Sequence, residues 1–212
     1  MNGVKELKYS STRGKAASVA SAEAIIQGLA ADGGLFVPEE MPKADPDFIA
    51  GMRQLSYEER AARILGLFLT DYTSKELAGC IARAYGGGKF DDVRIAPVHA
   101  LKEFPVLELW HGPTSAFKDM ALQLLPQLLQ TALKKTGEDA EILILVATSG
   151  DTGKAALEGF ADVNQIKILV FYPTGGVSKI QNLQMCTQKG ANVRVVAVKG
   201  NFDDAQNGVK EI

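Results

Sequence analysis

Histidine, cysteine and tryptophan are scarce in this chain, which contains two histidines, two cysteines and one tryptophan among its 212 residues. Cys80 and Cys186 lie far apart in expected helices, so we interpret them as buried reduced thiols; neither a disulfide nor a catalytic pair is favoured. His99 and His111 lack the ligand spacing of a structural zinc site, and we therefore expect no bound metal.

An excess of charge and long apolar runs are also absent. The formal net charge is −2, which gives no general attraction for nucleic acid or for an anionic membrane. No apolar run approaches the roughly 18 residues that a membrane-spanning helix needs. The start of the chain, MNGVKELKYSSTRG, lacks the apolar core of a signal peptide. We therefore expect a cytoplasmic protein without nucleic-acid or membrane partners.

The first 95 residues carry mainly helical patterns. Two capping boxes predict helix starts: Ser56 with Glu59, and Thr73 with Glu76. The glycines of YGGGKF at positions 85–90 interrupt these patterns. We therefore expect a mainly helical N-terminal domain over residues 1–95.

After residue 95 the pattern changes to strands that alternate with helices. The segments typical of buried strands are FPVLELW, EILILVA, IKILVFY and NVRVVAV. Between the first two, SAFKDMALQLLPQLLQTALKK predicts a long helix with a kink near Pro126. The pattern predicts an α/β fold in which residues 96–212 form part of a doubly wound, mostly parallel sheet. The last helix keeps its apolar spacing up to Ile212 without a cap, so we expect an incomplete α/β domain.

A glycine-rich turn, SGDTG at 149–153, follows the strand EILILVA and opens a helix. A nucleotide-binding P-loop requires the pattern G-x-x-x-x-G-K-[ST]. Thr148 stands where its first glycine should be, and Ala155 replaces the hydroxyl that would hold magnesium. A P-loop-like nucleotide-binding protein is therefore disfavoured, although it stays open as an alternative.

The same turn has the features of a site for another anion. Backbone N–H groups at the start of a helix lack partners, and the helix dipole is positive there. A carboxylate could be bound by these groups without a lysine. The candidate residues are Ser149, Gly150, Asp151, Thr152 and Gly153. The alternative is a tight turn in which Asp151 only caps the helix.

Lys118 opens the helix that follows the strand FPVLELW. Most lysines on helices are solvated charges. In open α/β sheets, however, ligands collect at the carboxyl ends of the strands. Because the glycine-rich turn follows the next predicted strand, we expect Lys118 and the turn to meet at one edge of the sheet.

Five segments carry a resemblance to a known family: YSSTRG, HGPTSAFKDMALQ, VATSGDTGKAAL, YPTGGVSKIQNLQM and VKGNFDDAQ. Together they resemble threonine synthase, a pyridoxal-phosphate enzyme of the fold-type II group. The resemblance spans the whole chain in the family's order, and the family continues well past residue 212.

The resemblance implies that Lys118 forms the Schiff base with pyridoxal phosphate and carries protons during the reaction. It implies that Phe117 and Asp151 contact the cofactor and that the turn at 149–153 grips the substrate carboxylate. The substrate would be O-phosphohomoserine, and the products threonine and phosphate. Only an unprotonated amine attacks an aldehyde, and an apolar pocket favours that form of lysine.

The loop that binds the cofactor phosphate and the partner of the ring nitrogen have no candidate in this sequence. We expect both beyond residue 212, in the rest of the parent chain. The 212 residues alone should then bind pyridoxal phosphate weakly and turn over little or no substrate.

Two other functions stay open: a lyase that releases an oxo acid from the same substrate, and a scaffold without an active site. The roles of five residues also stay open. Arg13 could meet a phosphate or form a surface salt bridge, and His111 could line the pocket or be hydrogen-bonded in its turn. Thr114 and Ser115 could touch the cofactor or the substrate, or cap the helix leading to Lys118, and the cap is favoured for Ser115. For Lys154 a solvated side chain is favoured over a catalytic one.

Overall fold

The computed structural model describes residues 6–212, and the chain divides into two compact units. The first, here called the helical unit, contains the described residues up to Gly87 together with 127–138. The second, the sheet unit, contains Gly88–Pro126 and Asp139–Ile212. The α/β fold class is confirmed. The domain boundary expected near residue 95 stays a prediction.

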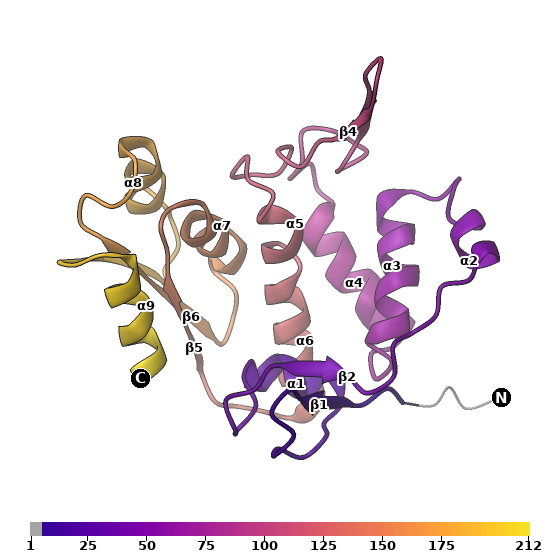
Figure 1. The fold of residues 1–212 in the computed structure, drawn as a ribbon, viewed down its shortest axis with the longest axis horizontal. Helices are drawn as coiled ribbons and strands as arrows, with labels where there is room; N and C mark the ends of the chain where they lie inside the picture. Colours follow the sequence, from indigo (N-terminus) through magenta and orange to yellow (C-terminus); the bar gives the residue numbers. More distant parts are fainter. Residues whose placement is uncertain (1–5) are drawn as a thin grey trace. The chain divides into compact units, whose positions relative to one another are not determined.

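The helical unit contains two short strands and several helices (Figure 1). Its elements before residue 87 are β1 (Tyr9–Ser11), α1 (Ser21–Gln27), β2 (Phe36–Pro38), α2 (Pro46–Ala50), α3 (Tyr57–Phe68) and α4 (Ser74–Tyr85). β1 and β2 pair antiparallel, and α3 packs on α4. Both predicted capping boxes are present at the starts of α3 and α4, so the helix starts are confirmed.

Helix α6 (Leu125–Thr136) supplies the rest of the helical unit. The Cys80 thiol donates to the Gln127 carbonyl at 3.3 Å, and the Tyr72 hydroxyl donates to the Leu128 carbonyl at 3.1 Å. The core of the unit includes Leu77, Ile81, Ala84, Leu129, Ala132 and Leu133, all buried. Burial of these apolar side chains is the main stabilising contribution to the unit.

The long helix predicted across Pro126 is two helices, α5 (Asp119–Leu122) and α6, with a break at residues 123–124. Pro126 has no N–H group, so the carbonyl of Leu122 lacks the hydrogen bond that an uninterrupted helix would give it. The expected kink is therefore a complete interruption.

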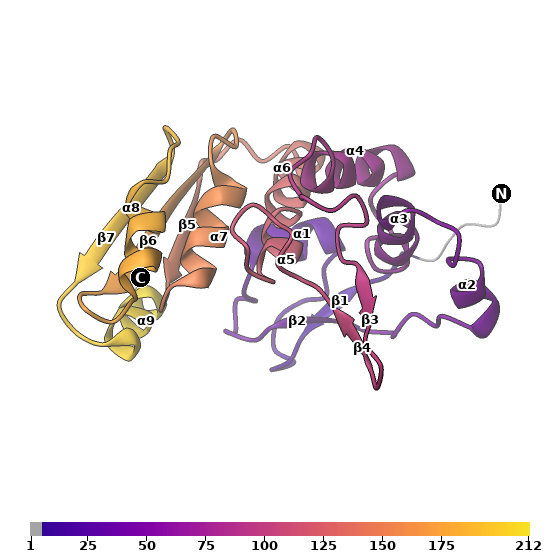
Figure 2. The same ribbon diagram turned by 90° about the horizontal axis from the view of Figure 1, so that it is seen from above.

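The sheet unit is built on three parallel strands in the order β5–β6–β7 (Figure 2). They are β5 (Ile142–Ala147), β6 (Ile166–Pro173) and β7 (Val193–Val198). The helices are α7 (Asp151–Phe160), α8 (Lys179–Cys186) and α9 (Phe202–Glu211). Val170 of β6 faces α7, whereas its neighbour Phe171 faces α9. Since successive side chains of a strand point to opposite faces, α7 and α9 cover opposite faces of the sheet.

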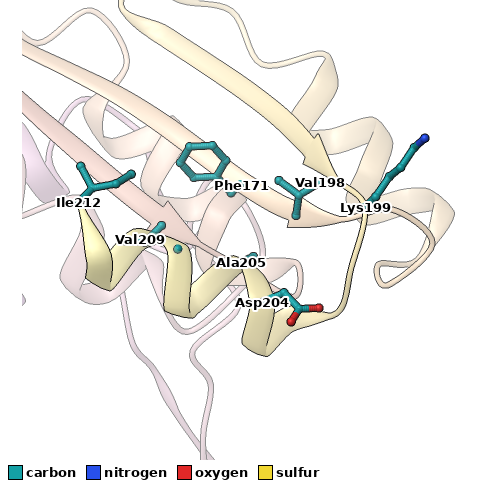
Figure 3. Close-up of a pocket in the computed structure, with 8 residues that line it drawn as sticks. Phe171, Val198, Lys199, Asp204, Ala205, Val209 and Ile212 are labelled. Atoms are coloured by element: carbon teal, nitrogen blue, oxygen red, sulfur yellow. The ribbon is translucent and has the colours of Figure 1, made fainter.

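The two faces of this sheet are covered unequally. On the α7 face, Ile168 and Val170 are fully buried, whereas on the α9 face Leu143 is 55% and Val196 41% exposed. A groove of about 250 Å³ lies on the α9 face, between the ends of β6 and β7 and the helix (Figure 3). Its apolar lining includes Phe171, Val198, Val209 and Ile212. The α9 face therefore presents more apolar surface to solvent than the α7 face.

The segment FPVLELW does not join the parallel sheet, so that part of the fold prediction is wrong. Its strand, β4 (Pro105–Leu107), pairs antiparallel with β3 (Val98–Ala100), and Val98 lies opposite Leu107. The hairpin closes through a hydrogen bond from Leu101 N–H to the Phe104 carbonyl at 3.1 Å. Adjacent segments joined by so short a connection can pair only antiparallel, because parallel neighbours need a long crossover.

Both cysteines are free thiols. Cys80 is buried as expected, but Cys186 at the end of α8 is exposed, which corrects the sequence interpretation. In α8 the preceding residue, Met185, takes the buried position, so the thiol at the next position points outward. None of the helices within residues 6–212 is long and apolar enough to cross a membrane.

Candidate active site

Lys118 lies at the N-cap position of α5 and is half-buried. Helix α5 packs against α7 so closely that a side chain on Gly159 would meet the Leu122 carbonyl oxygen at 1.9 Å. The helix that follows Lys118 thus lies against the helix that follows the glycine-rich turn. The expected meeting at two neighbouring strand ends is wrong, because the strand before Lys118 belongs to the hairpin.

Phe117 is the aromatic neighbour of the lysine amine. The Nζ atom of Lys118 lies 4.4 Å from the centroid of the Phe117 ring. Phe117 as a whole is 60% exposed. Contact between the two side chains is therefore present, while contact of Phe117 with a cofactor stays a proposal.

Asp119 fixes the loop that leads to Lys118. Its carboxylate accepts hydrogen bonds from the Thr114 N–H at 2.8 Å and the Thr114 hydroxyl at 2.7 Å. The Asp119 side chain is fully buried, and burial raises its pKa. A Cβ on Gly112 would lie only 2.6 Å from this carboxyl group, so glycine is required there for the close approach. Asp119 therefore holds the residues before Lys118 in one conformation.

This network decides the roles of two neighbouring hydroxyl residues. The Thr114 hydroxyl donates to Asp119 and does not cap α5, while a contact of Thr114 with the cofactor or the substrate stays a prediction. Ser115 has φ of 57° and donates its N–H to the Gly112 carbonyl. It therefore forms part of a turn, and the favoured helix-cap role for Ser115 is wrong. Sequence reasoning missed Asp119, because an aspartate at the start of a helix is ordinarily solvated.

The glycine-rich turn is organised by Thr148, which sequence reasoning also missed. Its hydroxyl oxygen accepts hydrogen bonds from the Gly150 N–H at 3.0 Å and the Gly153 N–H at 2.9 Å. This use of a threonine hydroxyl on backbone two or more residues ahead is a known turn device, and the signal was present in the sequence. Thr148, which stands where a P-loop would have its first glycine, therefore organises the turn through its hydroxyl group.

Three N–H groups of the turn remain for an anion. Within the part of the chain that the structure describes, the N–H groups of Ser149, Asp151 and Thr152 have no protein acceptor. They belong to the start of α7, where unpaired N–H groups and the helix dipole favour a negative charge. The turn can therefore bind a carboxylate, with Gly150 and Gly153 in supporting positions only.

Asp151 is exposed and is the first residue of α7, while Gly150 takes the N-cap position. Gly150 has φ of 145°, a conformation that residues with a side chain rarely adopt. The alternative of Asp151 as the helix cap is therefore wrong. Its Oδ1 atom instead accepts a hydrogen bond from the side-chain amide of Gln181 in α8 at 2.9 Å.

Lys154 is engaged in contacts within the sheet unit. Its amine donates to the side-chain carbonyl of Gln188 and lies 3.4 Å from the Glu158 carboxylate. The side chain is only 16% exposed, which corrects the expectation of a solvated lysine. Since the P-loop lysine must reach a nucleotide phosphate, these contacts weigh against the nucleotide-binding alternative.

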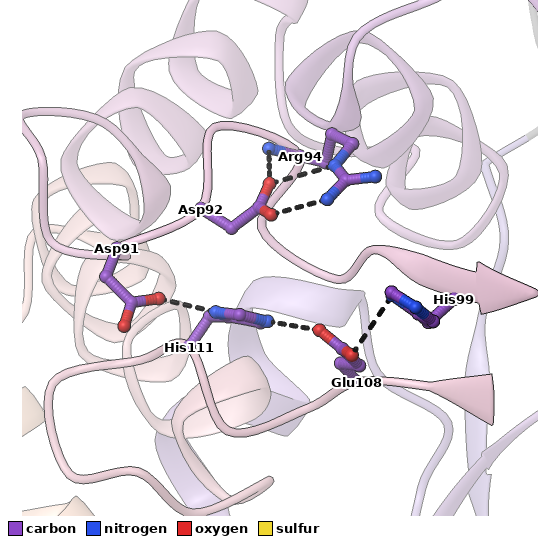
Figure 4. Close-up of polar contacts among 6 residues, drawn as sticks. All are labelled: Asp91, Asp92, Arg94, His99, Glu108 and His111. Carbon is purple, nitrogen blue, oxygen red and sulfur yellow. Dashed lines mark hydrogen bonds and ion pairs between the residues drawn. The ribbon is translucent and has the colours of Figure 1, made fainter.

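His111 is hydrogen-bonded on both sides of its ring (Figure 4). Its Nδ1 lies 2.5 Å from Asp91 and its Nε2 lies 2.8 Å from Glu108. The hydrogen bonds with Glu108 and with Asp91 raise the pKa of His111. The other oxygen of Glu108 lies 3.8 Å from His99 in the hairpin. Of the two alternatives for His111, the structure shows the hydrogen-bonded one.

We predict that His111 makes the stability of the chain depend on pH. Because the folded state raises its pKa, protonation stabilises the fold below the unfolded value of about 6.5. This contribution is lost as the pH rises through the folded pKa. Urea unfolding at a series of pH values should show this loss for the wild type and a flatter profile for His111→Gln. The control His99→Gln, which keeps both bonds of His111, should retain the wild-type profile. An unchanged profile in His111→Gln would contradict the prediction.

Arg13 belongs to the helical unit and lies beside Asp32. Its guanidinium donates to the Asp32 backbone carbonyl at 2.9 Å. The Asp32 carboxylate accepts from the Ser11 hydroxyl at 2.6 Å, and this bond contributes most to lowering its pKa to about 2. The loop is therefore organised by Asp32, and a phosphate contact of Arg13 stays a prediction.

Solved structures define the class to which this fold belongs. A threonine synthase from Brucella melitensis with bound pyridoxal phosphate matches 97% of this chain, with a TM-score of 0.87 and 39% identity. Yeast threonine synthase matches 96% with a TM-score of 0.86 and 37% identity. The match covers 44% of the first structure's chain and 42% of the second's. The fold is thus that of the corresponding part of fold-type II pyridoxal-phosphate enzymes.

Sequence comparisons agree with the structures. Residues 8–85 match the family "Threonine synthase N terminus". Threonine synthase of Pseudomonas aeruginosa is 42% identical over 96% of this chain and 43% of its own length. That of Schizosaccharomyces pombe is 38% identical over 98% of this chain and 42% of its own length. In sequence and fold the chain is similar to the N-terminal portion of threonine synthases, and it spans less than half the length of these relatives.

The site residues fit the cofactor of this family in part. Lys118 offers an amine at a position that Asp119 fixes, which suits covalent attachment to an aldehyde. The three N–H groups of the turn suit a carboxylate. The Lys118 amine thus suits the aldehyde of pyridoxal phosphate, and the N–H groups of the turn suit the carboxylate of an amino-acid substrate.

Proposed function

We propose that the complete protein containing this chain is a threonine synthase, a lyase that uses pyridoxal phosphate. It converts O-phospho-L-homoserine and water to L-threonine and phosphate. The observation that carries the proposal is the pairing of a fixed lysine at the start of α5 with an anion-binding turn at the start of the adjoining α7. The likeness to a threonine synthase that binds pyridoxal phosphate supports the choice of cofactor.

In this proposal Lys118 holds the cofactor aldehyde through its Nζ atom, with Phe117 and Asp151 beside the cofactor. When bound, pyridoxal phosphate withdraws electrons from the substrate carbons. The turn from Ser149 to Gly153 binds the substrate carboxylate and so orients the α carbon. The Lys118 amine, once released, accepts and returns protons at the α and β carbons.

The proposal includes a limited activity of these 212 residues by themselves. The relatives are more than twice as long as the part that this chain matches, since the match covers 42–43% of the first two. Groups that bind the cofactor phosphate and ring nitrogen are assigned to the remaining part. We therefore expect weak binding of pyridoxal phosphate and little or no turnover from the chain alone.

Product analysis tests the proposed reaction. The complete protein containing this chain is incubated with pyridoxal phosphate and O-phospho-L-homoserine, and the products are separated by chromatography. Equal amounts of threonine and phosphate are expected. An oxo acid with phosphate would favour the alternative lyase. The absence of any product, with cofactor bound or not, would contradict a threonine synthase and favour a scaffold.

A further inference from the structure

One side chain of α8, Gln181, lies directly on the glycine-rich turn. Its amide carbonyl accepts from the Ser178 N–H at 3.0 Å, as part of the capping box of α8. Its amide nitrogen donates to Asp151 Oδ1 at 2.9 Å. Because the carbonyl faces a donor and the nitrogen faces a carboxylate, both ends of the amide are matched to their partners.

The turn leaves room for this side chain only because residue 150 is glycine. A Cβ on Gly150 would lie 2.4 Å from the amide carbon of Gln181. Farther along, the contact between Lys154 and Gln188 fastens the segment after α8 to α7. Helix α8 is therefore held on α7 at two places, one of which is the turn itself.

The position of the Asp151 carboxylate matters for anion binding. It stands in the first turn of α7, beside the N–H groups of Ser149, Asp151 and Thr152, which have no acceptor among residues 6–212. Carboxylates are attracted to such groups at a helix start, so a free Asp151 side chain would compete with an incoming anion. The hydrogen bond from Gln181 gives this carboxylate another donor.

We propose that Gln181 is a positioning residue, which holds the Asp151 carboxylate to one side so that the turn stays open to a substrate carboxylate. This inference rests on the proposed carboxylate-binding role of the turn. It adds a residue on α8 that acts through Asp151 and does not itself contact substrate.

Nuclear magnetic resonance of the ¹⁵N-labelled chain tests the inference. L-threonine is the probe, and its methyl ester, which lacks the carboxylate, is the ligand control. The amide signals of Ser149, Asp151 and Thr152 should shift with threonine and not with the ester. In Gln181→Glu the capping box is kept, because glutamate also accepts from the Ser178 N–H. The donor to Asp151 is lost, so the affinity for threonine should fall roughly five- to tenfold, as expected for one hydrogen bond.

Two further variants separate this role from effects of charge and folding. Gln184→Glu adds the same charge to α8 about one helical turn after Gln181 and should bind threonine as the wild type does. Gln181→Glu combined with Asp151→Asn exchanges donor and acceptor at constant net charge, and should restore affinity toward the wild-type value. Equal affinities of Gln181→Glu and Gln184→Glu would overturn the inference, as would failure of the double variant to restore binding. If the wild-type chain shows no carboxylate-dependent shift, the proposed role of the turn fails and the inference fails with it.

Discussion

Replacing Lys118 by alanine should abolish the covalent trapping of pyridoxal phosphate by borohydride. The reduction fixes the cofactor only where an amine has already condensed with its aldehyde, so the trapped peptide identifies the attachment site. The loop that leads to Lys118 is held by the buried carboxylate of Asp119, which accepts two hydrogen bonds from Thr114. In the complete protein containing this chain, peptide mapping by mass spectrometry after reduction should therefore find the cofactor on Lys118 in the wild type and at no specific site in the variant.

Lys154→Ala provides the matched control. It removes the lysine that directly follows the glycine-rich turn at 149–153. The amine of this lysine contacts Gln188 and Glu158. Trapping on Lys118 should persist in this control, and neither chain should show magnesium-dependent affinity for nucleotides. Efficient trapping on Lys154, or nucleotide affinity lost on its replacement, would reverse the assignment in favour of the alternative function.

Features of the fold that depend on neighbours in sequence were predictable. The capping boxes at Ser56 and Thr73 place the starts of α3 and α4, since their hydrogen bonds join residues three apart. The alternation of apolar strands and helices likewise predicts the parallel sheet of the second half. The turn at 149–153 was found in the same way, because its glycines stand between a strand and a helix.

Features that depend on distant partners were not predictable from the sequence alone. FPVLELW has the composition of a buried strand, yet its pairing with β3 was decided by a short connection that periodicity does not detect. Gln181 contacts Asp151 across 30 positions of sequence. Asp119 is buried because of how its loop folds around it, whereas an aspartate at a helix start usually faces water. Such side chains can be assigned only once the tertiary contacts are known.

Gly159→Ala should destabilise the sheet unit, although alanine favours helices. Its methyl group would lie 1.9 Å from the Leu122 carbonyl oxygen, which is backbone and cannot rotate away. Forced separation in a packed interior costs about 1–3 kcal/mol, while the gain in helix propensity is at most about 1 kcal/mol. We expect a net loss in the free energy of unfolding, measured by urea denaturation. The separation would also move α5, so borohydride trapping on Lys118 should decrease.

Gly208→Ala is the control for helix propensity. Gly208 lies in α9 of the same unit, and a Cβ there would meet no atom within 4 Å. This variant should gain about 0.4–1 kcal/mol in stability, because alanine restricts the unfolded chain and fits the helix without contact. Opposite signs for the two variants would show that the close approach of α5 to α7 requires glycine at position 159. If both variants stabilise the chain to the same extent, α5 does not pack on α7 at this distance, and the placement of the helix that follows Lys118 against α7 loses its physical basis.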